Sequence, residues 1–159
     1  DFFHKLHPVP VIQEMVNRYS AEFDDVTFGL NIRRGIGNIQ YHVDAVEKSS
    51  TEMFIKYLHR VLDNNNKVKF FLTTDSNEII DQFVKEFGEK INYVQEDDQY
   101  PLDAAESVAG VQRALMDFYL LSKTAAVIAC YAVGFAKKAA EFGEIPILEL
   151  MDAKKRSEL

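Results

Sequence analysis

Cysteine is nearly absent from this sequence of 159 residues, and no apolar stretch reaches the length that crosses a membrane. The one cysteine, Cys130, excludes an internal disulfide and is typical of a protein from a reducing compartment. We therefore expect a cytoplasmic protein without a transmembrane segment. Peripheral attachment to a membrane stays open at this point.

Positive charge is also scarce. Lys and Arg number 18 against 25 Asp and Glu, which gives a net charge of −7 and a pI near 5.1. Proteins that bind nucleic acid usually carry a basic patch or stripe, so this composition argues against nucleic acid as a partner. An anionic ligand would have to be held by a local cluster of positive groups.

Two common kinds of site are missing as well. None of the four histidines lies at metal-ligand spacing with cysteine or carboxylate, apart from a loose His42-x-Asp44, so we expect no metal cofactor. Gly35-Ile36-Gly37 is not a dinucleotide fingerprint, because Gln40 stands where the third glycine would be. No Walker lysine motif occurs.

What the sequence does contain is a regular alternation of apolar strands and amphipathic helices. The wholly apolar run from Ala125 to Cys130 is typical of a strand buried on both faces. The alternation predicts an α/β fold of Rossmann-like type, a mainly parallel sheet with helices on both faces. We expect strands at 26–32, 67–73, 91–94, 125–130 and 145–150, and helices at 9–23, 49–62, 75–87, 108–123 and 134–142.

The length and the 47% hydrophobic content suffice for one domain with a core and are short for two. We predict a single domain over 1–159, with a helical lead-in at 1–25, a core at 26–150 and a charged tail at 151–159. Loops are expected at 35–48 and at 95–106.

Several helix ends carry local signals. Ser49-Ser50-Thr51-Glu52 predicts a capping box, in which a hydroxyl and a glutamate satisfy each other's backbone donors. Asp75 or Ser76 is expected to cap the helix that Gly88 ends, and Gly143 is expected to end the last helix.

The most informative stretch is Asn31-Ile32-Arg33-Arg34-Gly35, which follows directly on the apolar run 26–30. Two arginines at the carboxyl end of a buried strand suit an anion, because a guanidinium grips two phosphate oxygens at once. Open α/β sheets also bind ligands just outside the carboxyl ends of their strands. A pair of surface arginines in ion pairs is the alternative that the position leaves open.

A second anion seat is expected at Val133-Gly134-Phe135, where a short helix begins. The first turn of a helix offers unpaired N–H groups and the positive end of the helix dipole. In a doubly wound sheet the fourth strand neighbours the first, so Arg33 and Arg34 would face this helix start across the topological switch point. Together these groups predict a clamp for a diphosphate.

Two carboxylates are further candidates. Asp75 stands at the end of a strand, where it is either a site residue or a helix N-cap. Asp117 lies in a helix between Met116 and Phe118, which indicates a partly buried acceptor that needs a donor. A polar-face residue without a partner is the alternative for Asp117. Cys130, in its apolar strand, is expected to be a core residue and not a nucleophile.

Four motifs, taken together and in order, resemble a known family. They are Asn31 to Gly35, the Phe-Phe-Leu-Thr-Thr-Asp-Ser at 70–76, the Val-Gln-Arg-Ala-Leu-Met-Asp-Phe-Tyr-Leu-Leu-Ser-Lys-Thr at 111–124, and the Ile-Ala-Cys-Tyr-Ala-Val-Gly-Phe-Ala at 128–136. Over residues 26–150 the chain resembles the donor-binding, carboxyl-terminal half of the α1,6-/protein O-fucosyltransferase superfamily, which includes the bacterial nodulation enzymes.

The resemblance implies one half of a two-domain glycosyltransferase of the GT-B type, with the active site in the cleft between two Rossmann-like halves. The expected donor is a GDP-sugar such as GDP-fucose, without a required metal, and the acceptor is a glycan or a protein. The chain would then be a fragment, and an amino-terminal acceptor-binding domain would be missing from it.

The resemblance also implies roles for particular residues. Asn31 falls on the signature histidine, and Arg33 falls on the arginine that contacts the diphosphate and helps the leaving group depart. Asp117 falls on the aspartate that reads the guanine edge, which suits a carboxylate because it accepts from both N1–H and the exocyclic amine. The phosphate-gripping Ser-Ser-Phe-Ser turn falls on 133–136.

The sequence departs from the family signature in several places. Asn31 replaces the histidine, Ile36 replaces an aspartate, and the turn has no hydroxyl. Asparagine still carries a donor, and backbone amides at Gly134 and Phe135 survive any change of side chain. Losing two or three charge-assisted bonds at roughly 1.5–3 kcal/mol each lowers the affinity for a diphosphate by several powers of ten.

Three functions are therefore left open. The first is the donor domain of a fucosyltransferase-like enzyme, for which no general base can be assigned in this stretch. The second is a catalytically inactive binding or interaction module, in which Arg33 and Arg34 form salt bridges and Asp117 is structural. The third is a phosphate-binding or regulatory domain of flavodoxin-like type, with Asp75 as the candidate phosphoacceptor.

Overall fold

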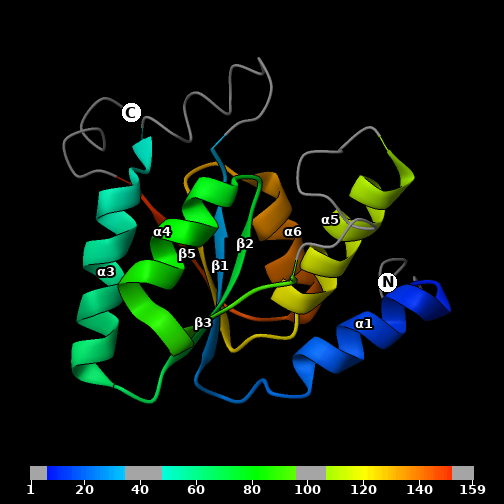
Figure 1. Ribbon diagram of the computed structural model, residues 1–159, viewed down its shortest axis with the longest axis horizontal. Coiled ribbons are helices and arrows are strands. Elements are labelled where there is room, and N and C mark those ends of the chain that lie inside the picture. The colour runs from blue at the N-terminus through cyan, green and yellow to red at the C-terminus, as the bar shows by residue number, and fades with distance from the viewer. Residues whose placement is uncertain (1–6, 35–47, 96–106, 152–159) are drawn as a thin grey trace.

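Five parallel strands form the centre of the structure, a computed structural model that describes residues 7–34, 48–95 and 107–151 (Figure 1). The strands are β1 (Thr27–Ile32), β2 (Lys69–Thr74), β3 (Ile91–Asn92), β4 (Ala126–Cys130) and β5 (Ile147–Leu150). Their order in the sheet is β3-β2-β1-β4-β5, and every neighbouring pair is parallel. The expected α/β fold with a parallel sheet is confirmed.

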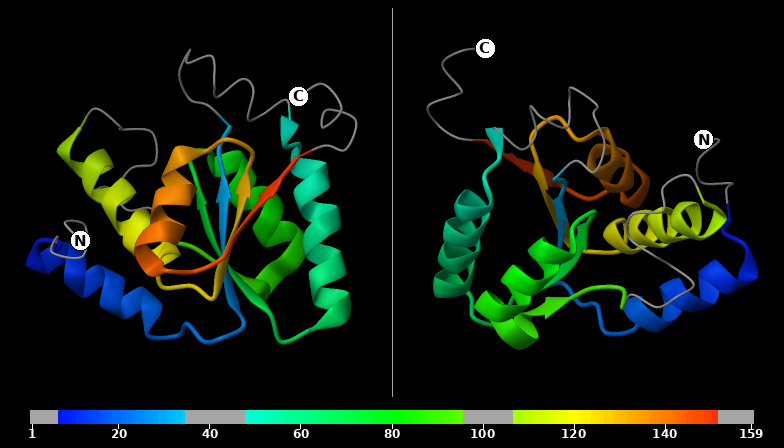
Figure 2. Two further views of the ribbon diagram at one scale, coloured as in Figure 1. Left: turned by 180° about the vertical axis from the view of Figure 1, so that it is seen from behind. Right: turned by 45° about the horizontal axis from the view of Figure 1, so that its top comes forward.

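Helices cover both faces of this sheet (Figures 1 and 2). α3 (Thr51–Asn64) and α4 (Asn77–Phe87) lie on one face, and α1 (Pro10–Ser20), α5 (Val108–Leu121) and α6 (Gly134–Gly143) lie on the other. A short 3-10 helix, η2 (Gly88–Lys90), leads into β3. The chain thus winds from β1 outward to β3 and then crosses back to β4, so the switch point lies between β1 and β4.

Alternation along the central strands divides the core into two layers. Leu30 and Ile32 of β1 belong to the buried cluster that contains Phe54 of α3 and Phe83 of α4. Phe71 of β2 points the other way, into the cluster formed with α1 and α5. Side chains one residue apart on a strand therefore serve opposite faces, and this period of two decides where the site residues point.

Two predicted helix ends differ in detail from the structure. Ser50, not Ser49, is the N-cap of α3 and accepts from the Met53 amide, so Glu52 lies one residue too early for a capping box and pairs instead with Lys56. Ser76 is the N-cap of α4, where its side chain accepts from the Ile79 amide at 3.4 Å.

The end of α6 differs as well. Gly143 is the last helical residue, and Glu144 takes the left-handed conformation with φ 53°. A glycine is required at position 143 by packing, because a Cβ there would lie 2.1 Å from the carbonyl oxygen of Ser122. Gly88, by contrast, has φ 56° and ends α4 as predicted.

Other boundaries shift by one to three residues. β3 is shorter than the expected 91–94 and ends at Asn92, and the first helix covers only part of 9–23. The predicted loops at 35–48 and 95–106 and the tail at 151–159 fall almost wholly outside the described residues, as do Gly35 and Ile36.

Candidate functional site

The carboxyl edge of the sheet brings together the ends of β1, β2 and β4. Arg33 and Arg34 follow β1, Asp75 follows β2, and α6 begins shortly after β4, which neighbours β1 as predicted. The candidate site therefore lies at the switch point, where open α/β sheets bind their ligands.

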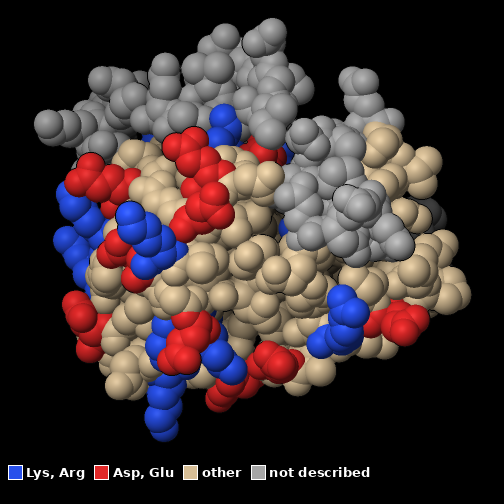
Figure 3. Space-filling view, viewed as in Figure 1, with Lys and Arg blue, Asp and Glu red and all other residues tan. Residues whose placement is uncertain are grey.

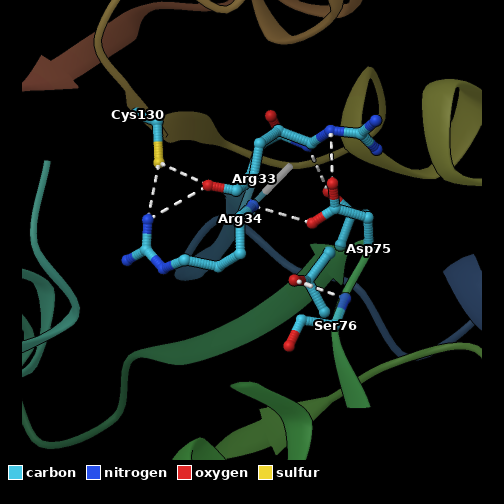
Figure 4. A network of polar contacts seen from close by, with 8 residues as sticks. Arg33, Arg34, Asp75, Ser76 and Cys130 are labelled. Atoms are coloured by element: carbon cyan, nitrogen blue, oxygen red, sulfur yellow. Dashed lines mark hydrogen bonds and ion pairs between the residues drawn. The ribbon is translucent and has the colours of Figure 1, made fainter. Parts of the chain in front are cut away.

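The two arginines do not face one another. Figure 4 shows their guanidinium groups extending in opposite directions from the strand end. Adjacent side chains of an extended chain point to opposite faces, so Arg33 shares the α5–α6 face with Asn31, and Arg34 shares the α3–α4 face with Ile32. The expectation that both side chains converge on one anion is not met.

The Arg34 side chain is used inside the protein. Its Nη2 and Nε donate to the Thr51 hydroxyl at 2.8 and 3.1 Å, and its Nη1 lies 3.1 Å from the Arg33 carbonyl oxygen and 3.7 Å from Cys130 Sγ. Together with Ser50, Thr51 and Ser76 it lines a cavity of about 360 Å³ between the amino ends of α3 and α4. Arg34 thus ties the end of β1 to α3 and β4.

Asp75 holds the turn after β1 in place, and it is not the helix cap. Its Oδ1 accepts from the Arg34 backbone amide at 2.8 Å, and its Oδ2 lies 3.3 Å from Arg33 Nε (Figure 4). The side chain of Asp75 is only 7% exposed. Hydrogen bonds to a charged group contribute about 1.5–3 kcal/mol each, so Asp75 fixes both the backbone and the direction of Arg33.

Arg33 keeps donors for a ligand. Its side chain is 36% exposed, and its ion pair with Asp75 uses Nε. In the described part of the chain its two terminal amino groups form no hydrogen bond or ion pair. A guanidinium anchored through Nε with both amino groups open is the arrangement that receives two oxygens of an anion.

Asp117 is buried and has a donor, which confirms the predicted acceptor. Arg113, one turn earlier on α5, places Nε 3.3 Å from Asp117 Oδ1, and the two side chains are 4% and 9% exposed. Burial raises the pKa of Asp117 from 3.8 to about 6, while the positive charges of Arg113 and Arg33 oppose that rise. The influence of Arg33 on this carboxyl means that β1 and α5 bring the two groups near one another.

Asn31 is bound to the neighbouring strand. Thr73 Oγ1 donates its only proton to the Leu30 carbonyl oxygen at 3.0 Å, so it accepts from Asn31 Nδ2 at 2.8 Å. The side-chain N–H group of Asn31, which we expected to donate to a ligand, therefore donates to Thr73 instead. Asn31 Oδ1 is buried and has no hydrogen-bond partner among the residues that the structure describes.

The turn between β4 and α6 is held from both sides. The Ser49 hydroxyl donates to the Leu150 carbonyl oxygen and accepts from the Tyr131 amide, and Glu149 accepts from the Ala132 amide at 2.8 Å. Ala132 has φ 59°, a strained value for a residue with a Cβ. These contacts fix where α6 begins.

The start of α6 differs from the starts of α3, α4 and α5, each of which has a serine cap. Its N-cap, Val133, is buried and supplies no side-chain hydrogen bond. Gly134 is exposed, and no atom of the described residues lies within 4 Å of a Cβ placed on it. Phe135 packs on Phe118 of α5 with ring centroids 5.9 Å apart. Among the described residues, the first-turn amides of α6 thus have no side-chain cap.

Sequence reasoning missed Arg113, Thr73, Ser49 and Glu149. Arg113 had a usable signal, since it lies four residues before Asp117 on the same helix face. The other three depend on strand register and on contacts between distant segments, which no local pattern carries.

The charges on one face of the molecule and the search for metal ligands give no further candidate site in the described part of the chain. On the face in Figure 3, Lys and Arg are interspersed with Asp and Glu, so no single-sign patch dominates it. Within the described residues no group of three His, Cys, Asp or Glu could hold a metal ion. No helix in the described ranges is both long and apolar enough to cross a bilayer.

No protein-family model and no curated protein matches the sequence, but solved structures match the fold. NodZ α-1,6-fucosyltransferase soaked with GDP-fucose has a TM-score of 0.63 at 22% identity, over 92% of this chain and 46% of that one. Fucosyltransferase NodZ from Bradyrhizobium gives 0.63 at 20% identity, over 92% and 46%. POFUT1 in complex with GDP gives 0.57 at 10% identity, over 89% and 46%.

These similarities confirm the expected fold resemblance to fucosyltransferases. The chain has the α/β architecture found in part of those enzymes, and it spans about half of their length. At 10–22% identity the likeness concerns the fold, and the function rests on the site.

Proposed function

We propose that this chain is the donor-binding domain of a fucosyltransferase-like glycosyltransferase and binds a GDP-sugar. The observation that carries the proposal is Arg33 at the carboxyl edge of the sheet, anchored through Nε to Asp75 and with its terminal amino groups open among the described residues. Similar folds whose structures contain GDP or GDP-fucose support the choice of ligand.

The residues divide into those that touch the nucleotide and those that position them. Arg33 and the backbone amides of Gly134 and Phe135 hold the diphosphate. Val133 is the last residue of the turn that presents these two amides. Asp117 accepts from the guanine edge. Asp75 and Arg34 position the end of β1, and Arg34 does so because its side chain is bound to Thr51. Asn31 lies beside Arg33 on the same face.

The chemistry follows from where charge develops. When the bond between the sugar and the β-phosphate breaks, negative charge grows on the leaving GDP and positive charge grows on the sugar ring. A fixed guanidinium at the β-phosphate stabilises that leaving group without reorganising during the reaction. The acceptor, a glycan or a protein, and any base that activates it belong to the other half of a two-domain enzyme.

Calorimetry with GDP, GMP and UDP tests the proposal. The protein should bind GDP more tightly than GMP, because only GDP offers a β-phosphate to Arg33, and more tightly than UDP, because only guanine offers two donors to Asp117. Arg33→Ala should abolish the GDP signal. Arg60→Ala, an exposed arginine on α3, is the matched control and should bind like the unchanged protein. Absence of GDP binding to the protein refutes the proposal.

One observation favours the second candidate, an inactive binding or interaction module. Arg33 is already paired with Asp75, and Arg113 with Asp117, so the four charges balance without a ligand. In that case none of the three nucleotides binds, and Arg33→Ala lowers stability without changing any nucleotide signal.

A further inference from the structure

Among the described residues, one buried side-chain nitrogen or oxygen has no hydrogen-bond partner, and it belongs to Asn31 at the carboxyl end of β1. Asn31 is 2% exposed, and its Oδ1 makes no hydrogen bond. A buried acceptor without a donor is unfavourable, and native proteins pair the great majority of such groups. An exception at a ligand-binding edge calls for a donor that arrives with the ligand.

The orientation of this amide follows from its neighbours. The Thr73 hydroxyl has one proton, which it donates to the Leu30 carbonyl oxygen. It therefore accepts from Asn31 Nδ2, and the amide cannot be turned over without placing two acceptors face to face. The atom that remains unpaired is thus an acceptor, and an acceptor repels phosphate oxygens.

The position of Asn31 indicates which donor it meets. Asn31 and Arg33 lie on the same face of β1 two residues apart, about 7 Å along the strand. A diphosphate held by Arg33 is flanked by the ribose on one side and by the transferred sugar on the other. Both present hydroxyl groups, which are neutral donors of the kind that the Asn31 oxygen lacks.

We propose that Asn31 Oδ1 accepts a hydrogen bond from a hydroxyl of the nucleotide-sugar, and that Thr73 is the positioning residue that keeps this oxygen turned toward it. This inference rests on the proposed function, since it takes the diphosphate to lie at Arg33. Through the Asn31–Thr73 pair, the protein binds ligands that carry a hydroxyl group next to the diphosphate more tightly than ligands that lack it.

Binding of hydroxyl-deleted ligands to the unchanged protein is the first test. Calorimetry compares GDP with 2′-deoxy-GDP and 3′-deoxy-GDP, and GDP-fucose with its singly deoxygenated analogues. One deoxy compound should bind about tenfold more weakly than its parent, close to 1.4 kcal/mol. A ribose analogue or a sugar analogue in that role identifies the source of the hydroxyl.

Two sets of variants connect the loss to these residues. Asn31→Leu has a similar volume and no acceptor, so it should bind the parent and the deoxy ligand equally. Thr73→Val should lose the discrimination although Thr73 does not touch the ligand, and Thr73→Ser, which keeps the hydroxyl, should retain it. Thermal melting checks that each variant is folded.

The possible outcomes separate this inference from the function on which it rests. If GDP binds and every deoxy ligand binds as tightly as its parent, the Asn31 oxygen is paired with buried water and the inference is wrong while the function stands. If GDP does not bind at all, both are wrong. Discrimination that persists in Asn31→Leu also overturns the assignment to Asn31.

Discussion

The pKa of Asp117 links α5 to the end of β1, and removing Arg33 should change it. The Asp117 carboxyl has a pKa of about 6, raised from 3.8 by burial, and Arg33 is one of the two arginines that hold it below a still higher value. We therefore expect Arg33→Ala to raise the pKa of Asp117 further. Arg60→Ala, on the surface of α3, should leave it unchanged.

The same pKa predicts a pH-dependent contribution to stability. Because the pKa is higher in the folded chain than in the unfolded one, the folded state binds a proton more tightly between pH 4 and pH 6. The buried carboxylate costs about 3 kcal/mol at pH 7, and about 1 kcal/mol of that is recovered on lowering the pH to 5. The unchanged protein should thus gain stability relative to Asp117→Asn as the pH falls.

Two measurements check this prediction. Carbon-13 NMR of the aspartate carboxyls follows Asp117 directly, with Asp117→Asn identifying its signal. Urea unfolding of both proteins at pH 7 and pH 5 gives the stability difference, and contributions from other carboxylates cancel in the comparison. A titration midpoint of Asp117 near pH 4 would show that burial does not raise its pKa, and a midpoint that does not respond to Arg33→Ala would show that Arg33 does not act on it.

Three further predictions concern Asp75, two glycines and Cys130. Asp75→Asn should destabilise the protein by about 1.5–3 kcal/mol in urea unfolding, because the ion pair to Arg33 and a charged acceptor for the Arg34 amide are lost. An unchanged unfolding midpoint would contradict the role of Asp75. Gly143→Ala should destabilise by more than about 2 kcal/mol, because its Cβ would meet Ser122, whereas Gly134→Ala has open space and should stay within about 1 kcal/mol. Burial raises the pKa of the Cys130 thiol, so the thiol should react with a thiol reagent only as fast as the protein unfolds. Rapid labelling of the folded protein would contradict this prediction.

The fold was predictable from the sequence because its signals are local. The apolar run at β4 and the amphipathic stretches between strands fix element types, and their alternation leaves a parallel sheet as the solution. Ends were harder. Gly143 was expected to end the last helix, yet it is the last helical residue and is needed for a close approach to Ser122. Helix propensity does not contain such a contact between distant segments.

The site was predictable in its location and less so in its geometry. Placing Arg33 and Arg34 together overlooked the period of two, which sends adjacent side chains to opposite faces and commits Arg34 to Thr51. For Asp75 the sequence left a helix N-cap and a site residue as alternatives, because it stands where a strand ends and a helix begins. Only the register of β1 and β2 brings it to Arg33. The unpaired oxygen of Asn31 likewise depends on Thr73, its neighbour across the sheet.

A structure of the protein with bound GDP would show whether the diphosphate lies at Arg33. We expect the β-phosphate within hydrogen-bonding distance of the terminal amino groups of Arg33 and of the first amides of α6. A diphosphate lodged in the cavity that Arg34 and Thr51 line on the opposite face of the sheet would contradict it.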